Sequence, residues 1–198
     1  MSGKWFGWCE RDAMRRAVFL DRDDTLIENG SLPWERVGAP RGDLCDPAWV
    51  RLLPGAAEGC RVLAGAGYAL VVVTNQGLVA RGVGTLEDVE RTNRRMVELL
   101  REGGVPGLAG IYVCPYHPRG TVAPYNVEHE WRKPAPGMIL SAARELDLDV
   151  SGSWMVGDSA RDVEAGIASG IARERCLLVG PSREIPGLLE AARRIVGS

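Results

Sequence analysis

Short apolar runs recur along the chain, each followed by polar residues, and longer amphipathic stretches lie between them. The apolar runs lie near residues 17–20, 69–73, 110–113, 154–156 and 176–179. Apolar runs of this length between turn residues are typical of buried strands. Their alternation with helical patterns predicts an α/β domain in which helices cover a central parallel sheet.

The stretches between the runs carry helix-start signals. Pro54-Gly55 predicts a helix that ends near Ala66, and the string from Thr85 to Asp88 resembles a capping box ahead of apolar residues at helical spacing. Pro136 predicts another helix start, and residues 158–170 form the next helical pattern.

The composition fits one globular domain. The chain has 198 residues, of which 45% are hydrophobic and 25% charged, and domains usually run to about 100–200 residues. We expect an N-terminal extension over residues 1–15 and the folded domain over residues 16–198. The aromatic residues of the extension, Trp5, Phe6 and Trp8, could pack on the domain or mark a contact.

The charge and hydropathy of the chain exclude some classes of binding partner. The formal net charge is −2 without a concentrated basic stretch, which argues against nucleic acid or an anionic membrane as a partner. No apolar run approaches the roughly 18 residues of a membrane span, and Arg15 and Arg16 interrupt any signal-peptide core. We therefore expect a cytoplasmic monomer. Its five scattered Cys residues suggest reduced thiols rather than a disulfide framework.

Two carboxylates follow the first apolar run. Asp21 and Asp23 are two residues apart, so in an extended chain their side chains point the same way. Two anions so close are costly unless a metal ion or a Lys compensates them. The pattern therefore indicates a phosphoryl-transfer site and predicts a cation nearby.

Further candidates follow later strands. Thr74, Asn75 and Gln76 follow the second apolar run and could cradle a phosphate, Lys133 supplies a cation, and Asp158 and Asp162 follow the fourth run. Ligands of an open α/β sheet bind at the carboxyl ends of its strands. These residues are therefore expected to meet there.

Taken in order, these motifs resemble the haloacid dehalogenase-like (HAD) phosphatases. Longer strings look like the branch of D-glycero-D-manno-heptose 1,7-bisphosphate phosphatases and histidinol phosphatases. These strings are Val72-Val73-Thr74-Asn75-Gln76, Ala80-Arg81-Gly82, Cys114-Pro115, Trp131-Arg132-Lys133-Pro134 and Met155-Val156-Gly157-Asp158. The resemblance covers roughly residues 17–179 and implies a Rossmann-like HAD fold. The segments on either side of Thr74 are too short for a folded lid, so we expect no separate cap domain.

The resemblance suggests a role for each catalytic candidate. Asp21 would attack phosphorus to give an aspartyl-phosphate, and Asp23 would shuttle the proton. Thr74 and the Asn75 amide would bind a phosphoryl oxygen, and Lys133 would neutralise the cluster. The alternative for the two Asp residues is a turn or cap at a strand end, and Lys133 could lie in a solvated basic turn.

A hard oxygen site is expected for Mg²⁺. Its ligands would be the carboxylates of Asp21 and Asp158 and, as the resemblance implies, the backbone carbonyl of Asp23. Asp162 would orient this shell, or serve as a first-turn acid of its helix. Asp158 could instead be a helix N-cap.

The chain departs from the family pattern at two positions near the predicted catalytic residues. Asp24 stands where the family usually has Gly in a tight turn, a position that Asp can occupy with left-handed φ. Ser159 stands where heptose bisphosphate phosphatases often have Lys.

The family's structural zinc loop is altered. Only Cys114 matches the family's Cys₃His ligand set, because Tyr116 takes the place of the His and His129 and Trp131 take the places of two Cys. We predict a zinc-free loop held by packing of Tyr116, Tyr125 and Trp131. The alternative is another site built from Cys114, His117 and His129 with a nearby Glu.

These features predict a Mg²⁺-dependent phosphatase for a small sugar phosphate, with heptose 1,7-bisphosphate cleaved at position 7 as the first candidate. Arg81 and Arg132 would grip distal oxygens or a second phosphate, with Asn75 and Gln76 also in the substrate site. Histidinol phosphate is the alternative substrate. A catalytically silent phospholigand-binding module is disfavoured because the carboxylates are intact, and a nucleic-acid end phosphatase is disfavoured by charge.

Overall fold

A five-stranded sheet forms the centre of the protein, in a computed structural model that describes residues 15–197. Its strands run in the order β3-β2-β1-β4-β5 and all pair in parallel. They are β1 (Arg15–Leu20), β2 (Ala69–Asn75), β3 (Gly110–Cys114), β4 (Leu148–Gly157) and β5 (Cys176–Leu178). The five predicted strands are confirmed, although β4 begins six residues earlier than the apolar run from Trp154. The aromatic residues Trp5, Phe6 and Trp8 lie outside the described residues.

The described part of the chain also contains six α-helices and two short 3-10 helices, all but the last of which lie between strands. The α-helices are α1 (Trp34–Val37), α2 (Ala56–Gly65), α3 (Leu86–Glu102), α4 (Gly137–Glu145), α5 (Ala160–Ser169) and α6 (Leu188–Val196), and the 3-10 helices are η1 (Pro47–Trp49) and η2 (Arg173–Arg175). The predicted capping box begins α3, where Thr85 and Asp88 satisfy each other's backbone amides. A second capping box, from Ser159 and Asp162, begins α5.

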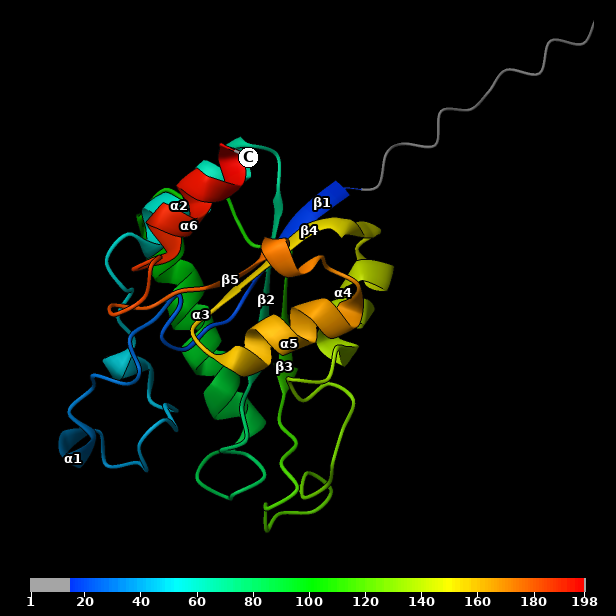
Figure 1. The fold of residues 1–198 in the computed structure, drawn as a ribbon. Helices are drawn as coiled ribbons and strands as arrows, with labels where there is room; N and C mark the ends of the chain where they lie inside the picture. The colour runs from blue at the N-terminus through cyan, green and yellow to red at the C-terminus, as the bar shows by residue number, and fades with distance from the viewer. Residues whose placement is uncertain (1–14, 198) are drawn as a thin grey trace, which may run out of the picture.

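Helices cover both faces of the sheet (Figure 1). Alternate strand residues point to opposite faces, so Val18, Val72 and Val156 belong to a core shared with α2, α3 and α6. Their neighbours Phe19 and Val71 belong to the core shared with α4 and α5. This three-layer arrangement fixes the strands and places their carboxyl ends at one edge.

No second sheet is present among residues 15–197, which confirms the expected Rossmann-like HAD fold without a cap domain. The segment between β1 and β2 holds only α1, η1 and α2, and the segment between β3 and α4 is an irregular loop. In the same described range, no helix is both long and apolar enough to cross a bilayer.

Candidate active site

The carboxyl ends of β1, β2 and β4 bring the predicted acidic and polar residues together. Asp21 directly follows β1, and its backbone amide donates to the carbonyl of Val156 on β4 (2.9 Å). Thr74 and Asn75 end β2, and Asp158 directly follows β4. Parallel pairing of adjacent strands therefore produces the cluster that the sequence predicts.

Lys133 lies at the centre of the cluster and is only 3% exposed. Its Nζ lies 2.5 Å from Oδ1 of Asp21 and 2.7 Å from Oδ1 of Asp162, and it donates to the carbonyl of Val73 (2.7 Å). Burial alone would lower the pKa of Lys133, but Asp21 and Asp162 outweigh it and raise that pKa. A permanent buried cation thus compensates the acidic cluster, and the alternative of a solvated basic turn is wrong.

The side chain of Asn75 holds Lys133 in place. Its Oδ1 accepts from the Lys133 backbone amide and its Nδ2 donates to the Lys133 carbonyl, both at 3.0 Å. This two-way contact joins the end of β2 to a loop 58 residues away. The side chain of Asn75 therefore fixes the cation, and the phosphate contact of its backbone amide stays a prediction.

The carboxylates of Asp21, Asp158 and Asp162 could hold a metal ion, since oxygens of the three lie within 4.8 Å of one another. Burial raises the pKa of Asp158 to about 7, helped by Asp21, Asp162 and Asp24. Carboxylate oxygens suit Mg²⁺, and a divalent cation would relieve this repulsion. The donor set therefore fits the expected metal.

Asp162 is fully buried, and its carboxylate contacts neighbouring protein groups rather than the cavity. One of its oxygens pairs with Lys133, and the other accepts from the backbone amide of Ser159 (2.9 Å). It is therefore both the capping-box acid of α5 and a support for the cluster. Ser159, not Asp158, is the N-cap of this helix, so the N-cap alternative for Asp158 is wrong.

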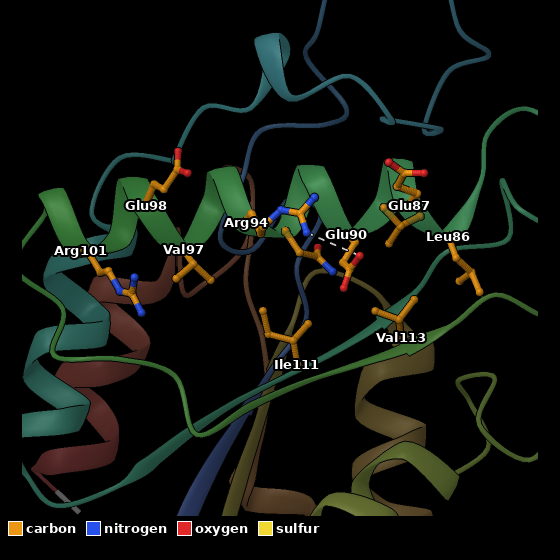
Figure 2. Close-up of a pocket in the computed structure, with 11 residues that line it drawn as sticks. Leu86, Glu87, Glu90, Arg94, Val97, Glu98, Arg101, Ile111 and Val113 are labelled. Carbon is orange, nitrogen blue, oxygen red and sulfur yellow. Dashed lines mark ion pairs between the residues drawn. The ribbon is translucent and has the colours of Figure 1, made fainter.

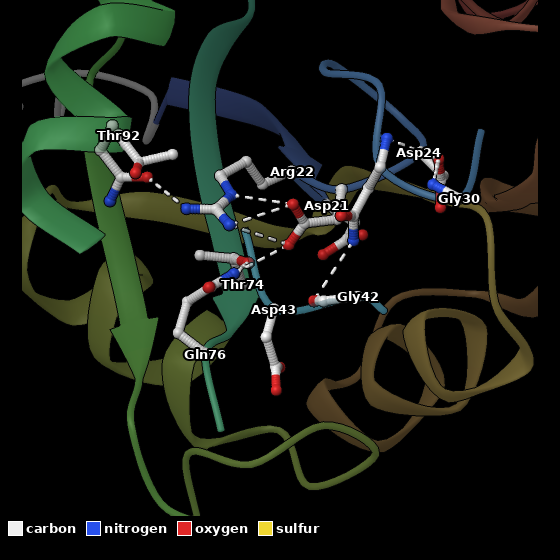
Figure 3. A network of polar contacts seen from close by, with 12 residues as sticks. Asp21, Arg22, Asp24, Gly30, Gly42, Asp43, Thr74, Gln76 and Thr92 are labelled. Atoms are coloured by element: carbon white, nitrogen blue, oxygen red, sulfur yellow. Dashed lines mark hydrogen bonds and ion pairs between the residues drawn. The ribbon is translucent and has the colours of Figure 1, made fainter. Parts of the chain in front are cut away.

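The Asp23 carboxylate is held from two sides. Arg22 Nη2 contacts both of its oxygens, at 3.0 and 3.1 Å, and Gln76 Nε2 donates to Oδ2 (2.8 Å). Gln76 Nε2 also lies 2.8 Å from Oγ1 of Thr74, which is buried beneath these contacts. Figure 3 shows this network, with Arg22, Thr74 and Gln76 labelled. Gln76 therefore links two predicted catalytic residues in addition to lining the cavity.

Asp24 adopts the left-handed conformation predicted for it, with φ of 56°. Its Oδ1 accepts from the backbone amides of Asn29 (3.0 Å) and Gly30 (2.7 Å). These bonds close the loop after β1. Asp24 therefore adopts the left-handed turn conformation that Gly usually provides in the family. Its carboxylate also adds negative charge near Asp158.

A cavity of about 470 Å³ opens over Asp21 and Asp23. Its rim is strongly basic and comes from several loops; the basic residues are Arg41, Arg81, Arg119, Arg132, Arg161 and Lys133, with His117 beside them. Burial lowers the pKa of His117, and the positive charges of Arg132, Arg81 and Arg119 lower it further. The rim is thus suited to an anionic ligand.

The two predicted substrate-binding arginines differ in their partners. Arg81 forms an ion pair with the buried Asp43. Arg132 is half-buried, donates to the carbonyl of Tyr116 (3.1 Å), and has no ion-pair partner among residues 15–197. Of these two arginines, Arg132 is therefore the one whose charge is left for a ligand.

The altered loop after β3 is packed by aromatic rings. Tyr116 stacks on His129, with 3.9 Å between ring centroids, and lies 5.6 Å from Tyr125. Trp131 contacts His129 and Tyr112 at 6.3 and 6.1 Å. The predicted packing of Tyr116, Tyr125 and Trp131 in this loop is confirmed.

A hollow of about 770 Å³ lies away from this chemistry, between α3 and the edge strand β3 (Figure 2). It is lined by apolar residues such as Val97, Ile111 and Val113 and by charged residues of α3. None of the clustered carboxylates reaches it, so size alone does not mark the active site.

The residues around the site that were not predicted to act there include Arg22, Asn93, Asp43 and Arg119, as well as Arg41 and Arg161 of the cavity rim. Arg22 and Asn93 meet only because α3 packs beside the end of β1 (Nη1 to Oδ1, 2.9 Å). Asp43 lies in an irregular loop without a periodic pattern. The sequence offers one signal that could have pointed to Arg22, which is its position between Asp21 and Asp23.

Comparisons with known proteins agree with this geometry. The HAD-hydrolase-like family model matches residues 130–182. A D-glycero-beta-D-manno-heptose-1,7-bisphosphate 7-phosphatase from Yersinia pestis is 38% identical over 176 residues, which is 89% of this chain and 86% of that protein. Its counterpart from Rhodopseudomonas palustris is 39% identical over 157 residues, covering 79% and 81% of the two chains.

A solved structure adds a ligand-bound neighbour. The D,D-heptose 1,7-bisphosphate phosphatase from B. bronchiseptica, complexed with magnesium and phosphate, superposes with a TM-score of 0.69 at 26% identity over 92% of this chain and 98% of that one. This chain belongs to the haloacid dehalogenase-like phosphatases, Mg²⁺-dependent phosphoric monoester hydrolases, in the branch that includes the heptose 1,7-bisphosphate 7-phosphatases.

Proposed function

We propose that the substrate is D-glycero-D-manno-heptose 1,7-bisphosphate, cleaved at the 7-position. The observation that carries the proposal is the basic cavity above Asp21, since a bisphosphate needs a second cationic site at a distance from the reacting phosphate. The names of the relatives from Yersinia pestis and Rhodopseudomonas palustris support the same substrate.

The residues divide the reaction between them. A carboxylate oxygen of Asp21 forms a bond to phosphorus as the bond from phosphorus to the sugar oxygen breaks, and Asp23 gives its proton to that oxygen. Asp23 then takes a proton from the water that hydrolyses the aspartyl-phosphate, which returns both residues to their starting states. Lys133 and the Asn75 amide offset the charge on the phosphoryl oxygens.

Magnesium would be held by the carboxylates of Asp21 and Asp158 and the backbone carbonyl of Asp23, with Asp162 supporting from behind. Bound there, it supplies Lewis-acid polarisation of a phosphoryl oxygen and offsets the negative charge of the cluster. The contacts of Asp162 with Lys133 and Ser159 favour the supporting role over direct ligation.

Arg132 is our choice for the second phosphate. It lines the cavity, and in the described residues no carboxylate pairs with it. Like charges from Arg161 and Arg81 oppose its own charge, so an anion between these groups would relieve the repulsion. Arg81, already paired with Asp43, would contribute less.

A screen of phosphate release tests the substrate. Purified protein with Mg²⁺ is given the heptose 1,7-bisphosphate, simple sugar monophosphates and histidinol phosphate at equal concentration. We expect the highest kcat/KM on the bisphosphate, with heptose 1-phosphate as product. A higher kcat/KM on histidinol phosphate would overturn the substrate assignment and leave the phosphatase chemistry in place.

We also propose that the loop after β3 works without zinc. The ring stacking between Tyr116 and His129 supports this, because His129 is engaged by Tyr116 and its Nδ1 accepts from the Trp131 amide (3.1 Å). Zinc analysis of the purified protein should give far less than one equivalent. Stoichiometric zinc lost on Cys114→Ser would refute the proposal. The cytoplasmic location, the monomeric state and the lack of a nucleic-acid partner stay predictions from the sequence.

A further inference from the structure

Arg22 lies between the two catalytic carboxylates in the sequence, yet its side chain is fully buried. Its Nε and Nη2 donate to Oδ1 of Asp23 at 3.2 and 3.0 Å, and Nη2 also reaches Oδ2 at 3.1 Å. A planar guanidinium that contacts both oxygens of a carboxylate fixes its orientation, which a single ammonium cannot do.

The other end of Arg22 is tied to the scaffold. Its Nη1 donates to Oδ1 of Asn93 at 2.9 Å. Asn93 is buried on α3, the same helix whose Met96 and Leu100 pack into the core against the sheet. The guanidinium is thus held by a packed helix rather than by a loop.

Gln76 closes the opposite side of Asp23. Its Nε2 donates to Oδ2 of Asp23 and to Oγ1 of Thr74, both at 2.8 Å. Together, Arg22 and Gln76 contact both oxygens of the Asp23 carboxylate from two sides. These two neighbours therefore hold the Asp23 side chain in one orientation.

We propose that Arg22 is the positioning residue for proton transfer by Asp23, and that Asn93 on α3 anchors it. Residues 15–197 contain no cap domain that could press on Asp23 when substrate binds, so in this part of the chain the carboxyl has to be oriented in advance by the domain itself. This inference rests on the proton-transfer role proposed for Asp23, and it does not depend on which sugar phosphate is the substrate.

Two esters that differ in their need for a proton separate positioning from general damage. Glycerol 3-phosphate has an alkoxide leaving group that must be protonated, whereas the phenolate released from p-nitrophenyl phosphate leaves without a proton. The comparison uses kcat/KM, which reports the steps up to the first irreversible one, here the formation of the aspartyl-phosphate. Asp23→Asn provides the reference pattern, a loss on the alkyl ester that far exceeds the loss on the aryl ester.

Arg22→Lys is the first variant. It keeps the buried charge but removes the two-oxygen contact, so the protein should fold. We expect kcat/KM to fall about 10- to 100-fold on glycerol 3-phosphate, a part of the roughly 10²- to 10⁴-fold that general acid catalysis contributes. On p-nitrophenyl phosphate the loss should stay within about threefold. Equal losses on the two esters, or none, would overturn the proposal.

Asn93→Leu tests the anchor from outside the site, with Thr92→Val as its matched control. Both residues are buried polar neighbours on α3, but the Thr92 hydroxyl donates to the Asp88 carbonyl within the helix (2.9 Å). Asn93→Leu should reproduce the ester-dependent loss at a smaller size, while Thr92→Val should leave the ratio of the two rates unchanged.

The controls keep the outcomes distinct. Far-ultraviolet circular dichroism and Tm confirm that each variant is folded, and if Arg22→Lys does not fold, Asn93→Leu decides alone. An ester-independent loss in Asn93→Leu would mean that Arg22 is only structural. If wild-type protein prefers a substrate other than the heptose bisphosphate, the proposed substrate fails but the ratio of the two simple esters still tests Arg22.

Discussion

At the scale of single residues, the main feature of the site is how its buried negative charges are compensated. Asp21 and Asp162 share the buried Lys133, whereas Asp158 has no ion-pair partner within the described chain and is available to the proposed metal ion. Breaking a buried ion pair costs far more than breaking a surface pair. Substitutions here must therefore separate chemistry from folding.

Asp21→Asn should abolish turnover while the protein stays folded. The amide keeps the size of the carboxylate and can still contact Lys133, but it cannot form the aspartyl-phosphate. Phosphate release and Tm, measured on the same sample, check both halves of the prediction. Activity within tenfold of wild type would contradict a nucleophilic role.

Mg²⁺ should stabilise the protein more at pH 8 than at pH 5. The pKa of Asp158 is raised to about 7 by burial and by Asp21, Asp162 and Asp24, so the metal-free fold binds a proton that the unfolded chain releases near pH 4. The stability of the metal-free protein therefore falls as pH rises from about 4 to about 7. Above that, the proton no longer competes with Mg²⁺.

The measurement is the Tm difference with and without Mg²⁺ at the two pH values, and EDTA should reverse the gain. Asp158→Asn is the control, since it removes the titrating ligand and should flatten the dependence on pH. An equal Mg²⁺ effect at pH 5 and pH 8 in the wild-type protein would show that Asp158 is not a ligand.

At the scale of elements, β4 and α5 approach each other closely where they meet at the site. A Cβ at Gly157 would lie 2.5 Å from the carboxylate of Asp162, too close for any side chain. Asp162 reaches both Lys133 and the Ser159 amide from the first turn of α5. The glycine therefore permits the close approach of helix and strand that completes the acidic cluster.

Gly157→Ala should lower both stability and activity. Forcing the start of α5 away from β4 is an overpacking change, worth about 1–3 kcal/mol, and it pulls Asp162 from Lys133. Gly65→Ala in α2 is the matched control, since a Cβ there meets nothing within 4 Å, and Ala in a helix is favoured by up to about 1 kcal/mol. Denaturant unfolding should give opposite signs for the two variants.

Elements were easier to predict from sequence than contacts between them. The five strands and the capping box at Thr85 follow from local pattern, because apolar runs and caps act over a few residues. The contacts that hold Asp23 cannot be predicted from local pattern, because Arg22 is anchored by Asn93, which lies 71 residues away in the sequence. The pairing of Arg81 with Asp43 likewise depends on the path of an irregular loop.

At the scale of the whole molecule, recognition falls to loops from separate parts of the chain. Arg41 precedes α2, Arg81 follows β2, and Arg119 and Arg132 belong to the long loop after β3, yet all line one cavity. Binding energy from groups remote from the reacting phosphate raises kcat/KM when it positions the transition state. The second phosphate of the proposed bisphosphate substrate is where such energy would arise.

Arg132→Ala should therefore weaken turnover of a sugar bisphosphate more than that of its monophosphate. A charge-assisted contact to a second phosphate is worth about 1.5–3 kcal/mol, or roughly 10- to 150-fold in kcat/KM. Lys133→Ala should damage both substrates equally, because Lys133 contacts Asp21 at the reacting phosphate. Since each variant is compared on two substrates, a general loss of stability cancels. Equal losses for Arg132→Ala would refute the second-phosphate role and favour a monophosphate such as histidinol phosphate.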